Sequence, residues 1–214
     1  MNKSLSLLAL VAVGTLAHAQ IASVSGATTV VAPPANVRDD QRESNTEAIL
    51  FLEQGVNVLA ANLKVDAVAP GTYNGAGDLS VNTILAGTKV ASYFLHTDPV
   101  GQTQKVYEGS MTFEQKILGV IATRGHLNDS DPILGNGGTL YPTGGSLDDA
   151  REFELSEAEY FVISPDSKSI RFRAVTSSRM DTFRVVTESV PEPTSMAALG
   201  LGLVGLVRKA RRKA

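Results

Sequence analysis

Residues 105–114 read KVYEGSMTFE, and this stretch has the clearest strand pattern of the chain. Tyr107, Gly109, Met111 and Phe113 would share one side of an extended strand, while the charged and hydroxyl residues between them would share the other. Side chains alternate between the two faces of a strand, so one face would lie on a core and the other in water. The stretch therefore predicts a half-buried strand of an antiparallel sheet.

The same alternation recurs along the chain. Residues 169–176 place Ile170, Phe172 and Ala174 on one face and two arginines on the other. Short apolar stretches separated by Gly, Pro, Asn and Asp are typical of strands joined by turns. Further strands are expected at residues 48–52, 56–65, 89–96, 117–123, 159–163 and 182–187. The pattern predicts an all-β domain, a β-sandwich or jelly roll, over residues 47–189.

Two segments depart from this pattern. Residues 20–46 are polar and contain Pro33-Pro34 and a charged run at 38–43, which predicts a flexible lead-in. Residues 146–158 are acidic and favour a short helix or a covering loop.

The N-terminus has the three parts of a secretory signal. Lys3 supplies a positive charge, an apolar stretch follows, and Ala17 and Ala19 are the small residues that a signal peptidase reads before Gln20. The apolar stretch is shorter than the roughly 20 residues that span a bilayer. We expect residues 1–19 to be a signal peptide and the mature chain to begin at Gln20.

The C-terminus, residues 190–214, is also organised in three parts. Pro191, Glu192 and Pro193 come first, and the prolines keep this stretch extended. An uncharged run, MAALGLGLVGLV, follows over residues 196–207 and predicts a short membrane helix. A basic tip closes the chain and resists translocation, so it would stay in the cytoplasm; its charged residues are Arg208, Lys209, Arg211, Arg212 and Lys213.

This order of parts resembles the PEP-CTERM tail, which is also labelled an ice-binding protein C-terminal domain. The resemblance implies that the chain comes from a Gram-negative bacterium that makes extracellular polysaccharide. It further implies that an exosortase, a membrane transpeptidase-like enzyme, cuts near Pro191-Glu192-Pro193. The chain would be held transiently at the inner membrane and then passed to the cell envelope or extracellular matrix.

Composition limits what the exported body can do. The chain has no cysteine, which excludes a disulfide framework, a thiolate metal site and a thiol nucleophile. Without Lys3, the basic tip and Glu192, the body keeps 13 Lys+Arg against 21 Asp+Glu, a net charge of −8. Such a body repels nucleic acid, so a nucleic-acid partner is not expected. It is compatible with divalent cations, and equally with simple solubility.

The sequence offers one tentative calcium site. Asn128-Asp129-Ser130-Asp131, followed by Asn136, crowds oxygen atoms into what is predicted as a loop. Asp129, Asp131 and Asn136 are the candidate ligands. The stretch lacks EF-hand spacing, and ordinary turn chemistry gives the same composition.

Catalytic signals are weak. His96 and Asp98 would share a strand face, which could orient an imidazole but more simply predicts a hydrogen-bonded pair. The two body histidines, His96 and His126, are too few and too far apart for zinc, and no G-x-S-x-G elbow occurs. A second acidic cluster could serve glycan hydrolysis across a cleft, or form a solvated face; its members are Asp148, Asp149, Glu152, Glu154, Glu157 and Glu159.

The body also resembles a group of uncharacterised bacterial exported proteins. The resemblance rests on pieces such as Tyr93-Phe94-Leu95-His96, Asp98-Pro99, Ile117-Leu118-Gly119-Val120 and Tyr141-Pro142. It implies a shared fold and lends no catalytic residue. We therefore expect a non-enzymatic protein with a structural or binding role near polysaccharide. A secreted glycan hydrolase and a calcium-dependent carbohydrate-binding module are the alternatives.

Overall fold

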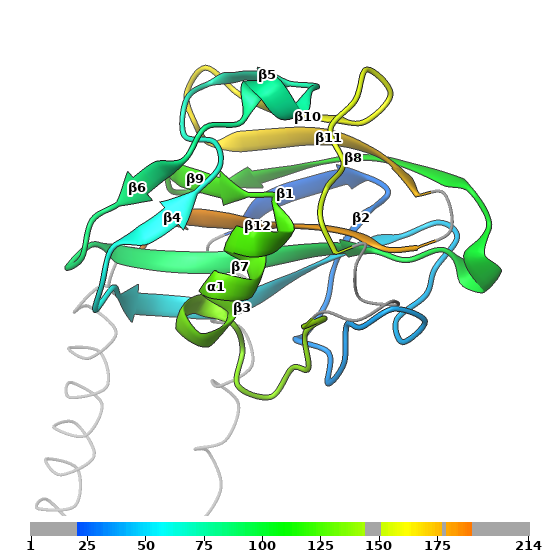
Figure 1. Cartoon of the computed structure of the whole chain (residues 1–214), viewed down its shortest axis with the longest axis horizontal. Helices are drawn as coiled ribbons and strands as arrows, with labels where there is room; N and C mark the ends of the chain where they lie inside the picture. The colour runs from blue at the N-terminus through cyan, green and yellow to red at the C-terminus, as the bar shows by residue number, and fades with distance from the viewer. Residues whose placement is uncertain (1–20, 144–150, 177–178, 190–214) are drawn as a thin grey trace, which may run out of the picture.

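Two five-stranded sheets make up most of the fold in the computed structural model, which describes residues 21–143, 151–176 and 179–189 (Figure 1). The first sheet has the order β1 (Ile21–Gly26), β8 (Lys105–Phe113), β11 (Ser169–Thr176), β10 (Tyr160–Ile163), β5 (Gly71–Tyr73). The second has the order β2 (Thr28–Val30), β3 (Ala48–Val58), β7 (Lys89–Thr97), β12 (Asp181–Glu188), β9 (Ile117–Ile121). Neighbouring strands are antiparallel except β2 and β3, which are parallel. The predicted all-β class is confirmed.

The two sheets enclose the main hydrophobic core. Tyr107, Met111 and Phe113 of β8 are buried in it together with Ile170 and Phe172 of β11. The second sheet contributes alternate residues of its central strands, among them Leu50, Tyr93, Leu95, Phe183 and Val185. The faces predicted for residues 105–114 and 169–176 are therefore the faces that are buried.

A second core lies on the other face of the second sheet. Phe51 of β3 and Phe94 of β7 pack there with ring centroids 5.6 Å apart. The layer over them consists of helix α1 (Arg124–Leu134), the two-stranded sheet of β4 (Leu63–Val65) and β6 (Asn82–Ile84), and loop residues such as Val37 and Tyr141. The second sheet is thus covered on both sides, which explains why β7 and β12 are buried along almost their whole length.

Gly109 of β8 shows how tightly the strands approach one another. A Cβ at this position would lie 2.3 Å from the hydroxyl of Thr28 and 3.0 Å from the ring of Phe172. The alternation of the sequence placed Gly109 on the core face, and the structure gives the reason that no side chain stands there.

Three sequence expectations are corrected. The lead-in predicted at 20–46 contains β1, which pairs with β8, and β2, which pairs with β3. The predicted loop at Asn128–Asp131 is part of α1. Residues 56–65 are not one strand, since β3 continues to Val58 and β4 begins at Leu63. Residues 151–158 form a covering loop without helix, whereas Asp148, Asp149, the signal segment and the tail beyond Ser189 lie outside the described residues.

Candidate functional site

Arg184 of β12 is fully buried on the outer face of the second sheet, beneath α1. Its guanidinium donates to both carboxylate oxygens of Glu53 on β3, at 2.6 and 2.7 Å, and to Oδ1 of Asp131 on α1 at 2.9 Å. Burial works against the charge of Arg184, but Glu53 and Asp131 outweigh it and raise its pKa. A charge in the interior is stable only when it is paired and hydrogen-bonded in this way.

Arg151 also binds the carboxylate of Asp131. It is also fully buried, and it donates to Asp131 at 2.6 and 2.9 Å, to Asn128 at 2.8 Å and to the carbonyl of Pro142 at 2.6 Å. Asp131 thus joins two buried arginines and fastens α1 to the sheet.

The three tentative calcium ligands do not converge. Both oxygens of Asp131 accept from arginine, while Asp129 is exposed two residues earlier on the same helix. Residues two apart on a helix face different directions. The amide of Asn136 donates to the carbonyl of Glu53 and accepts from the backbone of Gly138. Calcium at these three residues would have to displace the arginine pairs.

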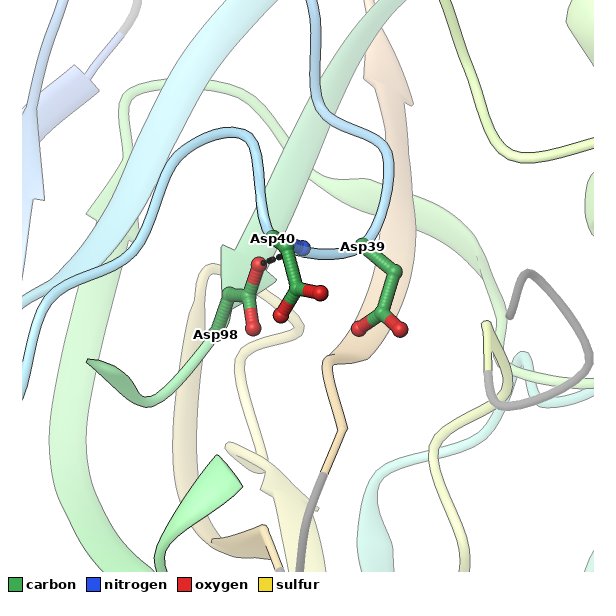
Figure 2. Close-up of side chains that lie close together, drawn as sticks. All are labelled: Asp39, Asp40 and Asp98. Atoms are coloured by element: carbon green, nitrogen blue, oxygen red, sulfur yellow. Dashed lines mark hydrogen bonds between the residues drawn. The ribbon is translucent and has the colours of Figure 1, made fainter. Parts of the chain in front are cut away.

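A different set of carboxylates converges at the end of β7. Oxygens of Asp39, Asp40 and Asp98 lie within 4.8 Å of one another (Figure 2). The backbone N–H of Asp40 donates to Asp98 at 2.9 Å, as the dashed line in Figure 2 shows. Burial raises the pKa of Asp98 to about 7, and the neighbouring Asp39 adds to the shift. Three carboxylates in this arrangement have the oxygen chemistry that Ca²⁺ takes as ligands.

The cluster of Asp39, Asp40 and Asp98 was not predicted from the sequence. Asp39 and Asp40 lie in the stretch assigned to the lead-in, some 60 positions before Asp98 in the chain. The adjacent acids of the Arg38–Glu43 run were visible, but only the fold brings them to the end of β7.

The predicted pairing of His96 with Asp98 is not present. His96 is 1% exposed, and neither ring nitrogen has a partner in good hydrogen-bond geometry, although the backbone of Arg42 lies near. Burial lowers the pKa of His96 to about 4, so the imidazole is neutral near pH 7. His96 is therefore a core residue of β7.

His126 on α1 has the carboxylate partner that His96 lacks. Its Nδ1 lies 2.5 Å from Oδ1 of Asp66. The other oxygen of this carboxylate, Oδ2, accepts the backbone N–H groups of Ala122 and Thr123 at 2.7 and 2.8 Å. The imidazole forms part of the wall of a cavity of about 170 Å³ between α1 and β4, lined by Asn62, Leu63, Lys64, His126, Asp129, Ser130 and Ile133. A buried carboxylate that fixes an imidazole is also the orienting half of a catalytic triad.

The hydroxyl in this cavity is engaged elsewhere. Ser130 donates to the carbonyl of Leu127 at 3.0 Å and accepts from the guanidinium of Arg184. A nucleophile needs a hydroxyl that gives its proton to the imidazole. The geometry instead makes Asp66 and His126 an anchor for the first turn of α1.

Among the described members of the second acidic cluster, Glu152, Glu154, Glu157 and Glu159, the fold buries Glu159. Its carboxylate accepts from the backbone of Val175 at 2.8 Å and contacts Asp181 of β12, which the sequence analysis did not single out. Burial raises the pKa of both carboxyls. The contact raises the pKa of Asp181 further, whereas at Glu159 the hydrogen bond with Asp181 works against the rise. Glycoside hydrolases hold two carboxyls about 5 Å or more apart across a cleft. Two buried carboxyls in direct contact do not provide that geometry.

The C-terminal tail matches a known family of sorting motifs. Residues 189–213 match the family described as the PEP-CTERM protein-sorting motif. The chain carries a PEP-CTERM sorting tail. This motif marks an exported protein that is sorted through the membrane and processed by an exosortase. It begins at Ser189, the last described residue, directly after β12.

The body has no comparable match. No curated protein and no solved structure matches the chain. Among the described residues, no helix is long and apolar enough to cross a bilayer, and the uncharged run at 196–207 lies outside them.

Proposed function

We propose that this chain is an envelope or extracellular-matrix protein with a non-enzymatic structural or binding role near extracellular polysaccharide. The observation that carries the proposal is the PEP-CTERM motif at residues 189–213, since an exported protein sorted through the membrane is delivered outside the cytoplasm, which supports an envelope or matrix location. The acidic, cysteine-free body suits a location outside the cell, where burial and backbone pairing supply its stability.

The chemistry of the described residues supports binding over hydrolysis. The oriented His126 lacks an available hydroxyl in its cavity, and Glu159 contacts Asp181 instead of facing it across a cleft. By contrast, the polar and charged loops at the end of β7 present Asp40 to solvent beside the buried Asp39 and Asp98.

A calcium-dependent form of the binding role is the second candidate. The observation that favours it is the convergence of Asp39, Asp40 and Asp98 within 4.8 Å. At Asp98 a proton competes with Ca²⁺ for the carboxylate, because the pKa of Asp98 is raised to about 7. Binding of Ca²⁺ would therefore strengthen as the pH rises through 7 and level off above it.

The test uses the mature protein recovered from the envelope of its host. Its binding to a glycan array is measured with Ca²⁺ and with a chelator, alongside N-terminal sequencing to check the start at Gln20. Binding to polysaccharide in both conditions supports the first proposal, and binding that needs Ca²⁺ and is lost in Asp40→Asn but kept in Asp129→Asn supports the second. Glycan cleavage, or recovery of the protein from the cytoplasm alone, would refute the proposed role.

A further inference from the structure

The point at which the tail leaves the body is fixed by three backbone neighbours. The N–H of Ser189 donates to the carbonyl of Lys89 at 3.2 Å, and its hydroxyl donates to the carbonyl of Gly55 at 3.0 Å. One residue earlier, the N–H of Glu188 donates to the carbonyl of Lys116 at 2.8 Å. The tail therefore starts between the end of β3, the start of β7 and the turn before β9.

Exposed apolar side chains gather at this same end of the molecule. Val56 and Val58, on one face of β3 immediately after Gly55, are 51% and 54% exposed. Leu85, in the turn between β6 and β7, is 65% exposed. A 2.8 Å bond from Gly87 N–H to the carbonyl of Leu59 joins that turn to the residue that follows β3. Figure 1 shows the ends of β3 and β6 and the start of β7 together. We call Val56, Val58, Leu85, Lys89 and Lys116 the exit surface.

The two ends of β7 differ in the charged residues that lie beside them. Lys89 and Lys116, both exposed, flank the tail exit at one end. The cluster of Asp39, Asp40 and Asp98 lies past the other end of β7, which is nine residues long. At a rise of about 3.3 Å per residue, roughly 30 Å separate the lysines from the acids. At the exit end Lys89 and Lys116 offset the exposed Glu114 and Glu188, whereas an anionic surface would repel the acidic cluster at the other end.

The chain leaves little distance between the body and the bilayer. Only residues 190–195 separate Ser189 from the uncharged run that begins at Met196. Six residues reach at most about 20 Å when fully extended. Once the uncharged run enters the bilayer, the exit surface is held within that distance of the headgroups.

We infer that the exit surface rests on the anionic lipid surface while the tail is anchored, so that the acidic end of the body points away from the membrane. The inference rests on the proposed membrane-sorted function. The valines and the leucine would enter the headgroup region, and the two lysines would pair with lipid phosphates. Tethering makes even a weak contact effective, because it raises the local concentration of the surface at the bilayer.

The experiment exploits the absence of cysteine from the chain. The full chain is reconstituted into vesicles of phosphatidylglycerol and phosphatidylcholine, with an environment-sensitive fluorophore on Val58→Cys. The matched control is Thr46→Cys, an exposed β-branched residue just before the opposite end of β3. We expect brominated lipids to quench the label at 58 at least threefold more than the label at 46. The variant Lys89→Glu/Lys116→Glu should lose at least half of the quenching at 58.

Each other result counts against the inference in a distinguishable way. A chain that floats with the vesicles but shows equal quenching at both positions, or none, overturns the orientation and leaves the anchored tail in place. Quenching at 58 that the Lys89→Glu/Lys116→Glu variant retains in full overturns the electrostatic contact. A fluorescence change at 58 that depends on the protein-to-lipid ratio assigns the surface to a second copy. A chain that does not float removes the anchored stage itself, and with it both the inference and the sorting proposal.

Discussion

Arg184 shows at the scale of one residue how partners from distant parts of the chain stabilise a buried charge. It stands in a strand that is buried on both faces, and its partners Glu53 and Asp131 come from β3 and α1. The sequence marks Arg184 as an ordinary polar position of a strand. Only its position under α1 makes it the centre of the ion-pair network.

We expect Glu53→Gln to lower the free energy of unfolding by about 3–5 kcal/mol, because it removes the charge that compensates buried Arg184. Urea unfolding followed by circular dichroism measures the loss. The control is Arg173→Gln, whose exposed pair with Glu108 should contribute no more than about 1 kcal/mol. The double variant Glu53→Met/Arg184→Met should recover most of the loss, and its failure to do so would show that the pair is not the origin of the effect.

Asp98 gives the protein a predictable response to pH. Its pKa is about 7 in the folded state and about 3.8 in the unfolded chain, so the folded state binds the proton more tightly. Stability from this group is fully present below pH 4 and is lost as the pH rises to 7. Asp98→Asn, whose amide oxygen can still accept from Asp40, should raise stability at pH 8 by on the order of 1–2 kcal/mol, reduced by the nearby solvent. Melting temperatures between pH 4 and 9 test this, and parallel curves for the two proteins would contradict it.

At the scale of elements, the sequence predicted strands best where one face is apolar and the other polar. The interval 169–176 coincides with β11, and 105–114 contains β8. β1 and β2 were missed because residues 21–30 are rich in Ser, Thr, Ala and Gly, which carry little alternation. α1 was missed because it contains Gly125 and Pro132 and buries only Leu127, Ser130 and Leu134. Its stability comes from tertiary partners that a local pattern does not show.

One such partner is Asp66, which we expect to hold the start of α1. Asp66→Ala would leave the N–H groups of Ala122 and Thr123 and the ring of His126 without their acceptor. Buried donors without partners cost about 1–3 kcal/mol, so the substitution should destabilise the protein by about that amount. Hydrogen exchange should accelerate most in α1. Asp129→Ala on the same helix is exposed and should change neither quantity by more than about 0.5 kcal/mol, and equal effects would contradict the anchoring role.

At the scale of the whole molecule, the candidate site could be predicted only in part. The sorting tail is read from contiguous residues, so its parts are visible in the sequence. The convergence of Asp39, Asp40 and Asp98 depends on the long-range packing of a loop against β7, and no local pattern reports it. For the same reason the tentative ligands Asp129, Asp131 and Asn136 were chosen by proximity in sequence, although Asp131 pairs with the two arginines, Asn136 bonds to Glu53 and Gly138, and Asp129 is exposed.

The tail allows each of its parts to be tested separately. Replacement of Pro191, Glu192 and Pro193 by alanines removes the extended stretch that a protease can draw into its active site, so we expect a full-length, membrane-anchored form. Neutral replacements of the five basic residues at 208–213 remove the barrier to translocation, so we expect the body to be secreted uncut. Fractionation and intact-mass measurement distinguish the two forms.

The wild-type surface protein should lack RKARRKA when the host has an exosortase and retain it when that enzyme is deleted. Recovery of RKARRKA in both hosts would leave only a simple tail anchor, because a basic tip and an apolar run suffice to hold a protein at a membrane without cleavage.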